Sequence, residues 1–482
     1  MFRIILIFFL LSTPVGLSAQ KKWDLKSCVE HAMLNNIAVK QSDLQSKINA
    51  LNLKQSVLSQ LPNFNLSTSG AYNSGNNQDP TTFTRVTQTY YSAGVQLQSS
   101  ADIFNFFSKR NTVAANEWEL MAAKANVNKV KYDVALSTAN AYLQVLLAEE
   151  QTKIASTQIF QTTTQLNRTK KLVDAGTLPE LNVTQLEAQL ALDSGNYIAS
   201  KGNFSQAMLS LKALMNIDAG EAFEIETPPI EAIPVDAIAD LQPDYVYNEA
   251  LKNQPQQLGN EYRLKAAQKS IEASRASRYP SLIAFASLGT NYLYFDKRPI
   301  YEKIITGYTS TGLVANAGGG VLYDVQSPLF VNGNVIDYFK SSSFGEQLKN
   351  NFRKSFGLSL NVPIFNGWSS SANYERSKLN LGRIQLQKEQ DNQKLKQDIY
   401  QAYNAAMVAL EKNNAALKSV QASEKAYEFA GKRFSIGALS TYDYIATQNT
   451  LLRAKLEYSI AQFDYVFKMK VLEFYKGAGL KL

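Results

Sequence analysis

Two residue types that build catalytic and metal sites are almost missing from this chain of 482 residues. Cys28 is the only cysteine and His31 is the only histidine. A single cysteine cannot form a disulfide framework, and we interpret Cys28 as a small residue on a helix face. One histidine and one cysteine also argue against a metal site or a nucleophile–base pair. No glycine-rich phosphate loop is present. The sequence therefore predicts no enzyme, no cofactor and no metal, and any energy source must belong to a partner.

Long hydrophobic runs occur only at the start of the chain. The segment MFRIILIFFLLSTPVGLSAQ has a basic start at Arg3, an apolar run from Ile4 to Leu11 and small residues at its end. This pattern predicts a secretory signal peptide over residues 1–19. No cysteine stands directly after residue 19, which argues against a lipid anchor. No later stretch of 18 apolar residues could form a transmembrane helix, but 25 Tyr and 24 Phe are compatible with membrane strands, whose sequence signal is weaker.

Charge of one sign is not concentrated anywhere. Lys and Arg exceed Asp and Glu by 49 − 41 = 8, and these basic residues are spread along the predicted helices. We interpret them as a solvated helix surface and expect no nucleic-acid partner.

Glycine and proline are absent from residues 105–175, a stretch of 71 residues. One helix of that length would be about 105 Å long at about 1.5 Å per residue. Gly176 and Pro179 then end it, as glycine and proline often do. Apolar or small residues repeat every seven positions, which predicts a supercoiled helix that packs along its length. The repeat consists of Val113, Leu120, Val127, Val134, Ala141 and Ala148.

Two segments before this helix alternate with a period of two. In the first, apolar residues such as Phe64 and Leu66 alternate with polar ones such as Asn65 and Ser67; the second, around Val95, behaves likewise. The pattern predicts strands with one apolar and one wet face, as in a barrel wall between lipid and a water-filled lumen. A helix from Trp23 to Gln60 is expected before them.

The chain is a tandem duplication. Ala32, Asn35 and Pro62 have counterparts 218 residues later, at Ala250, Asn253 and Pro280. The segment 103–105 (Ile-Phe-Asn) and Gly176 have counterparts 261 residues later, at 364–366 and Gly437. Each of the two offsets, 218 and 261 residues, is shared by separate matching positions. They indicate two halves with the same order of elements.

We predict an α+β membrane protein with tandem helix–strand–strand–helix–helix halves. Residues 20–217 form the first half, with strands at about 63–73 and 90–100 and a long helix at 105–175. Residues 218–245 form a linker. Residues 246–482 form the second half, with strands at about 281–293 and 354–363 and a long helix at 368–435. The step from 218 to 261 leaves 43 extra residues between the last two strands, which we expect to form a long surface loop.

Two hairpins per chain cannot close a barrel, and open sheet edges are not tolerated in lipid. The chain is therefore expected to oligomerise. The duplicated halves, the segment LSLNVPIFNGW (358–368) and the segment RFSIG (433–437) followed by Asp443 resemble the TolC-type outer membrane efflux proteins over essentially the whole mature chain. The order of these motifs is specific, although each one alone is weak.

The resemblance implies a homotrimer that forms a 12-stranded β-barrel in the outer-membrane lipid, continuous with a long α-helical barrel in the periplasm. It implies the outer-membrane channel of a tripartite efflux pump or a type I secretion system, a passive duct that works with a periplasmic adaptor (membrane fusion protein) and an inner-membrane transporter. The helix-to-helix turns would be the periplasmic tips that contact the adaptor. The residues concerned are Gly176, Thr177, Leu178, Arg433, Gly437, Ala438 and Leu439.

The resemblance also implies an entrance gate. Asp443 matches a position where the family commonly has an acidic ring, which would repel anions; an ordinary helix N-terminal Asp is the alternative. Ala446 replaces a second Asp of some members. Leu439 stands where some members carry an arginine that locks the closed tip, and Asn182 replaces an acidic partner. These departures leave the closed-state contacts open.

A different class of protein also fits part of the pattern. A trimeric coiled-coil surface stalk, or adhesin, would contain long helices and a barrel. Such stalks usually carry one rod and put the barrel at the chain end, whereas both predicted hairpins here are internal. We therefore favour the duct.

Overall fold

The structure of the chain is a computed structural model that describes residues 22–78, 85–227, 230, 233–295, 298–316, 318 and 322–477. The predicted signal peptide, residues 1–19, lies outside the described residues. The chain divides into two units. A helical unit contains the residues up to Leu53, Ala114–Gln268 and the residues from Lys378 onward, and a second unit contains Lys54–Val113 and Lys269–Ser377.

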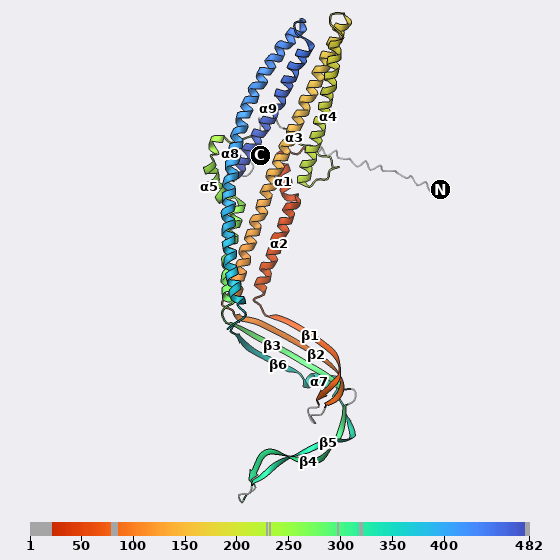
Figure 1. The fold of residues 1–482 in the computed structure, drawn as a ribbon, viewed down its shortest axis with the longest axis vertical. Helices are drawn as coiled ribbons and strands as arrows, with labels where there is room; N and C mark the ends of the chain where they lie inside the picture. The colour runs from red at the N-terminus through yellow and green to blue at the C-terminus, as the bar shows by residue number, and fades with distance from the viewer. Residues whose placement is uncertain are drawn as a thin grey trace, which may run out of the picture. The chain divides into compact units, whose positions relative to one another are not determined.

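The order of elements in the first half recurs in the second (Figure 1). Each half has two short helices, a strand pair, a very long helix and a shorter last helix. In the first half these are α1 (Leu25–Asn35), α2 (Ile37–Leu58), β1 (Asn63–Gln78), β2 (Arg85–Phe104), α3 (Ser108–Asp174) and α4 (Leu181–Met215). In the second they are α5 (Pro243–Asn253), α6 (Pro255–Ala276), β3 (Ser281–Phe295), β6 (Arg353–Asn361), α8 (Ser369–Ser435) and α9 (Thr441–Lys476).

The two long helices begin later than the sequence predicts. α3 starts at Ser108 rather than at residue 105, and α8 starts at Ser369 rather than at 368. Phe106 and Phe107 have φ values of 48° and 63°, and Gly367 and Trp368, which occupy the equivalent positions, have 63° and 65°. Residues with a left-handed backbone conformation cannot continue a right-handed helix. The same two-residue turn therefore precedes each long helix.

The prediction of a single helix from Trp23 to Gln60 is wrong. The helix breaks at Asn36, whose ψ of 137° is not helical. The Asn36 side chain accepts a hydrogen bond from the Ala38 amide (2.8 Å) and donates one to the Leu214 carbonyl at the end of α4 (2.8 Å). Gln254, 218 residues later, breaks the second half in the same way and donates to the Phe474 carbonyl at the end of α9 (3.1 Å). Each break therefore anchors the last helix of its own half.

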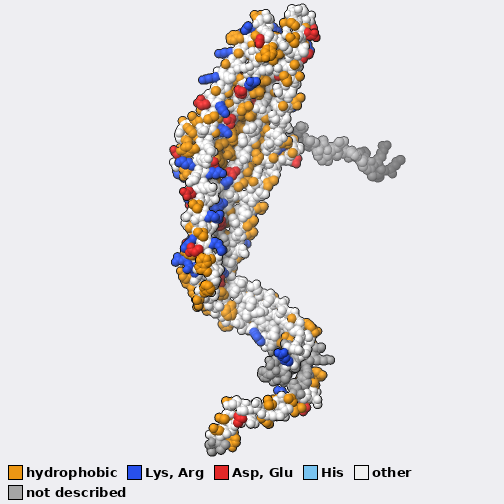
Figure 2. All heavy atoms as spheres, in the orientation of Figure 1, with side chains coloured by type: hydrophobic (Ala, Val, Ile, Leu, Met, Phe, Trp, Pro, Cys, Tyr) orange, Lys and Arg blue, Asp and Glu red, His pale blue; other side chains and the backbone are white. Residues whose placement is uncertain are grey.

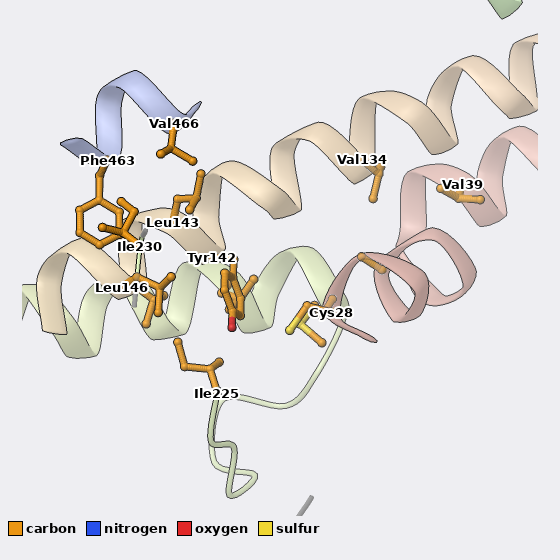
Figure 3. Close-up of a cluster of buried hydrophobic side chains, with 14 residues drawn as sticks. Cys28, Val39, Val134, Tyr142, Leu143, Leu146, Ile225, Ile230, Phe463 and Val466 are labelled. Carbon is orange, nitrogen blue, oxygen red and sulfur yellow. The ribbon is translucent and has the colours of Figure 1, made fainter. Parts of the chain in front are cut away.

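The core of the helical unit lies where α1, α3, α4 and α9 pack against the segment between the two halves. Tyr142 and Cys28 are buried at its centre, with exposed fractions of 1% and 0%. The Tyr142 hydroxyl donates to the Glu226 carbonyl, and the Trp23 amide donates to the Glu224 carbonyl (3.0 Å). Figure 3 shows the Tyr142 ring on α3 close to Cys28 on α1. The linker is thus held by a hydrogen bond from the α3 side chain of Tyr142, by a backbone hydrogen bond from Trp23 and by apolar contacts.

The second unit contains an antiparallel sheet in the order β1-β2-β3-β6. Its strands exceed the predicted bounds, except that β6 ends at Asn361, before Pro363, which has no amide hydrogen for the ladder. Register places Leu66 opposite Leu97, and Leu97 opposite Leu288. Asn65 lies opposite Gln98, and Gln98 opposite Ser287. The sheet therefore has one apolar and one polar face, as the alternation indicates.

The extra residues of the second half do not form a loop, so that prediction is wrong. They form a second hairpin, β4 (Arg298–Asn316) with β5 (Leu322–Phe339), and a short helix α7 (Phe344–Asn350). Bulges interrupt the β4–β5 register at several places, and these hide the period of two that identifies strands in the sequence.

Helix α7 covers the edge of β3 beyond the end of β6. β3 pairs with β6 only as far as Gly289. Further along, the Gln347 side chain accepts a hydrogen bond from the Leu293 amide (3.0 Å) and donates one to the Leu293 carbonyl (2.9 Å). Asn351 donates to the Asn291 carbonyl (2.7 Å). Side chains therefore satisfy backbone groups that would otherwise form an open edge.

Candidate functional site

The two helix-to-helix turns have the same backbone geometry. Gly176 and Gly437 have φ values of 72° and 75°, the left-handed region that glycine occupies without steric cost. After them, the Thr177 amide donates to the Leu172 carbonyl and the Ala438 amide donates to the Arg433 carbonyl, both at 2.9 Å. A hydrogen bond from the residue after a left-handed glycine back to the carbonyl five positions earlier commonly ends a helix. The duplication therefore extends to the hydrogen bonds of the turns.

Side chains reinforce each turn differently. The Thr177 hydroxyl donates to the Leu172 carbonyl (2.7 Å), and the Arg433 guanidinium donates to the Ala438 carbonyl (3.2 Å). Both side chains thus bind the turn that contains them. Arg433 and Thr177 are exposed, so a partner could still contact them.

A hollow of about 570 Å³ lies between the two turns. Five of the predicted tip and gate residues line it, together with others that the sequence did not single out. The predicted ones are Leu178, Asn182, Gly437, Ala438 and Leu439; the additional ones are Leu181, Gln185, Phe434, Ser440, Thr441 and Tyr442. Gly176, Thr177, Arg433, Asp443 and Ala446 do not line it.

Large apolar side chains are exposed beside this hollow. Leu181 is 63% exposed, Ile436 is 79% exposed and Tyr442 is 70% exposed. Such exposure of neighbouring apolar residues is typical of a contact surface. Sequence reasoning missed all three, although an isoleucine directly before the turn glycine was a visible signal.

Asp443 takes part in the N-terminal cap of α9. The Ser440 hydroxyl donates to the Asp443 carboxylate (2.7 Å), and the Asp443 amide donates to the Ser440 hydroxyl oxygen (3.0 Å). The bond from the Asp443 amide to the Ser440 hydroxyl is the usual side-chain contact of a helix N-cap, with Ser440 as the N-cap residue. Asp443 and Ala446 are both exposed. Asp443 therefore lies in the first turn of α9, with its carboxylate on the surface.

An aromatic cluster joins α8 to α9 next to the turn. The hydroxyls of Tyr427 and Tyr444 are 2.8 Å apart and hydrogen-bonded. The ring of Phe434 stacks on Tyr444 with centroids 4.7 Å apart and planes 20° apart. Burial, and then the hydrogen bond with Tyr427, raise the pKa of Tyr444 above its ordinary value. The two helices are therefore held together close to their turn.

A buried polar network joins α9 to α3 and α4. The Thr162 hydroxyl donates to one oxygen of the Asp193 carboxylate (2.6 Å), and the Gln189 amide donates to the other (2.7 Å). Gln448 on α9 donates to the Thr162 hydroxyl (3.3 Å), and Asn449 exchanges hydrogen bonds with Gln189. Thr162, Asp193 and Gln448 are at most 2% exposed. Buried polar groups of this kind fix one arrangement of the helices.

The apolar face of the sheet is the second candidate surface. Leu66 and Leu358 on this face are 69% and 67% exposed. At one end of the face, Tyr72, Tyr91 and Tyr294 lie in register across three strands, with neighbouring centroids 5.3 and 6.2 Å apart. Tyrosines border the lipid band of membrane barrels. Figure 2 shows charged side chains gathered over the helical unit and sparse over the sheet.

Among the described residues, no helix is both long and apolar enough to cross a membrane. Within that same part of the chain, no three His, Cys, Asp or Glu side chains are grouped as a metal ion would require. His31 lies against Asn35, whose amide nitrogen is 3.3 Å from its Nε2.

Comparison with known proteins identifies the family. The sequence profile described as "Outer membrane efflux protein" matches residues 29–216 and 246–468. These two ranges cover most of the chain and coincide with its two halves. The chain belongs to the outer membrane efflux protein family. It is therefore an efflux channel of the outer membrane, and the surface-stalk alternative is set aside.

Relatives in this family are distant in sequence and close in fold. The outer membrane efflux protein BepC of Brucella suis is 21% identical over 399 residues, which cover 82% of this chain and 74% of BepC. The outer membrane protein TolC of Escherichia coli is 21% identical over 355 residues, 72% of this chain and 63% of TolC. A crystal structure of CusC has a TM-score of 0.72 at 16% identity, covering 94% of this chain and 91% of CusC. The Campylobacter jejuni CmeC outer membrane channel has a TM-score of 0.71 at 18% identity, covering 95% and 86%.

Proposed function

We propose that three copies of this chain form a passive duct that crosses the outer membrane and extends into the periplasm. Each chain supplies a four-stranded sheet whose outer strands are β1 and β6, so three copies supply twelve strands. Pairing β6 of one copy with β1 of the next closes the barrel and removes every edge from the lipid. The exposed apolar face of the sheet supports this proposal most strongly.

The length of β6 fits the membrane. Its nine residues extend about 30 Å at about 3.3 Å per residue. A strand tilted by about 40° then rises about 23 Å, which is close to the apolar band of about 25 Å in outer-membrane barrels. The tyrosine row would lie at the outer boundary of that band.

Four helices per chain, α3, α4, α8 and α9, would form a twelve-helix tunnel in the trimer. The two turns would be its periplasmic tips. Exposed Leu181, Ile436 and Tyr442 would contact a periplasmic adaptor, and an inner-membrane transporter would supply the energy. We propose that the duct itself catalyses no reaction and needs no cofactor. Asp443 would form an acidic ring at the entrance, with Asn182 and Ala446 nearby, from its place in the first turn of α9.

The trimer and the duct are tested together. We expect the detergent-solubilised protein to have three times the chain mass, and electron microscopy to show a hollow tunnel. In planar lipid bilayers it should conduct ions. A monomeric mass, or a solid stalk without conductance, would overturn the proposal. An affinity-tagged copy should retain an adaptor when it is isolated after cross-linking in cells.

A further inference from the structure

The β4–β5 hairpin is apolar on both of its faces. Register pairs Ile304 with Val331 and Ile305 with Phe330. Successive residues of a strand point to opposite faces, so these two pairs lie on different sides. Leu329 joins the first side and Tyr308 the second, because a bulge separates Ile305 from Gly307. We name these sides the Ile304 face (Ile304, Leu329 and Val331) and the Ile305 face (Ile305, Tyr308 and Phe330).

All six side chains are exposed within a single chain. On the Ile304 face the exposed fractions are 46%, 50% and 48%, and on the Ile305 face they are 50%, 61% and 50%. Figure 2 shows apolar side chains along this hairpin. An isolated two-stranded hairpin is only marginally stable in water. The hairpin therefore needs something that covers both of its faces.

A lipid surface does not meet that need. A strand pair lying in or on a membrane has one apolar face, and its other face is polar. The central part of this hairpin has no polar face to turn toward water. A flat partner would likewise cover one face and leave the other exposed.

A ring of identical hairpins covers both faces. In a cyclic oligomer, one surface of each copy contacts a different surface of the next copy, and the rotation closes the ring. The Ile304 face of one hairpin would pack on the Ile305 face of its neighbour, and three such contacts would bury all six faces. This reasoning rests on the trimer proposed above.

The charges on the two faces are complementary. Glu302 and Lys303 are neighbours in β4, so they point to opposite faces. Glu302 shares its face with Ile304. Lys303 lies on the other side, 5.4 Å from the centre of the Phe330 ring. Both are exposed. Stacking unlike faces brings a carboxylate near an ammonium group, whereas stacking like faces would bring like charges together.

We infer that the β4–β5 hairpins of three copies stack on one another, Ile304 face against Ile305 face, and form a closed ring. The partner of the hairpin is thus a second copy of the same chain. The interface is held by apolar contacts and given its direction by Glu302 and Lys303.

Disulfide cross-linking tests the ring. Leu329→Cys is combined in turn with Ile305→Cys, Tyr308→Cys or Phe330→Cys, so that each chain carries one thiol on each face. Residues on opposite faces of one hairpin point apart and cannot form a disulfide within the chain. Under mild oxidation, at least one combination should give covalent dimers and trimers on a denaturing gel. The four single variants are the controls and should stay monomeric, because no face meets its own copy.

Particle mass in detergent is measured for every variant, which separates this inference from the proposed function. If the protein is trimeric and no combination cross-links, or the single variants cross-link equally well, the ring is wrong and the duct stands. If the protein is monomeric, both fail. Strong quenching by brominated lipid of a fluorophore attached at Leu329→Cys would show that lipid covers the hairpin and would also overturn the ring.

Charge reversal provides a second, independent test. Glu302→Lys or Lys303→Glu alone should slow the cross-linking severalfold, because like charges then face each other across each contact. The double variant Glu302→Lys/Lys303→Glu should restore the original rate, because unlike charges meet again. A double variant as slow as the single ones would exclude this pairing.

Discussion

The side-chain amides of Gln189 on α4 and Asn449 on α9 donate hydrogen bonds to each other, at 3.2 and 3.3 Å. The two residues belong to different halves of the duplicated chain, 260 positions apart. They lie beside the buried Asp193–Thr162 pair and connect it to α9. Separating α9 from α4 would break this reciprocal contact.

Removing either amide should destabilise the helical unit. Asn449→Ala should cost about 1 kcal/mol, and Gln189→Ala should cost more, because it also removes the hydrogen bond to the buried Asp193 carboxylate. The double variant should cost less than the sum, because both single variants remove the Gln189–Asn449 contact. Thermal unfolding of the solubilised protein measures this. Asn413→Ala on α8 is the control and should not destabilise, since the Asn413 side-chain oxygen is buried without a hydrogen-bond partner within the chain. Strictly additive losses would show that the two amides act separately.

Asp443→Asn should remove most of the cation preference of the channel. Selectivity follows the charges at the narrowest ring, and an amide keeps the size and can still accept from Ser440. The measurement is the reversal potential in planar bilayers under a salt gradient. Ser440→Ala should cost about 1 kcal/mol of helix capping and leave the selectivity unchanged. If Asp443→Asn conducts with unaltered selectivity, Asp443 contributes only to the start of helix α9 and forms no selective ring.

Gly437→Val should abolish efflux while the protein still reaches the membrane. A β-branched residue resists the φ of 75° at this turn, and the turn presents Ile436 and Tyr442. Drug susceptibility of cells and the amount of trimer in the outer membrane are measured together. Gly382→Ala in the interior of α8 is the control and should stabilise by up to about 1 kcal/mol. Normal efflux by Gly437→Val would place the adaptor contact elsewhere.

Cys28 should be inert in the folded protein. Burial, and secondarily the charge of Asp24, raise the pKa of the Cys28 thiol from 9.0 to about 12. At pH 8 the thiolate fraction should then be about a thousandfold lower than for an ordinary thiol. Reaction with a thiol reagent at pH 8 should be undetectable until denaturant is added. Ser435→Cys in a Cys28→Ala background should react at once, because Ser435 is exposed. Rapid labelling of native Cys28 would contradict this packing.

The β4–β5 hairpin should lie outside the cell. It connects β3 to β6, and the helices at the other ends of these strands are proposed to point into the periplasm. A protease site inserted beside Gly318 should be cut on intact cells, whereas a site inserted beside Gly437 should be cut only after the outer membrane is opened. Cleavage in the reverse order would invert the proposed topology.

The sequence predicted those parts of the fold that are determined by local chemistry. Gly176 and Gly437 identify the turns because only glycine adopts the left-handed φ readily. The β1 and β2 alternation identifies the two faces because the pairing of these two strands continues without a bulge. Asn36 breaks a helix with no glycine or proline nearby, and its reason is a hydrogen bond to Leu214, which is distant in the sequence.

The tip required three-dimensional information. The Tyr427–Tyr444 contact bridges α8 and α9 across the turn. The two residues are 17 positions apart and lie on different helices, so the periodicity of one helix does not pair them. The hollow between the turns combines residues from both halves of the chain. The 43 additional residues were mistaken for a loop because bulges shift the alternation of β4 and β5.

Gln347 has a consequence for how the chains find one another. Its amide imitates a neighbouring strand on Leu293 and so occupies part of the one edge that β6 leaves uncovered within the described sheet. Within the four-stranded sheet, only β1 and β6 then remain as edge strands to which another copy can add. A sheet with two complementary edges grows into a closed ring or a single row, whereas a third edge would let newly secreted chains branch. By helping to cover this edge, Gln347 directs encounters between four-stranded sheets toward rings and away from branched aggregates.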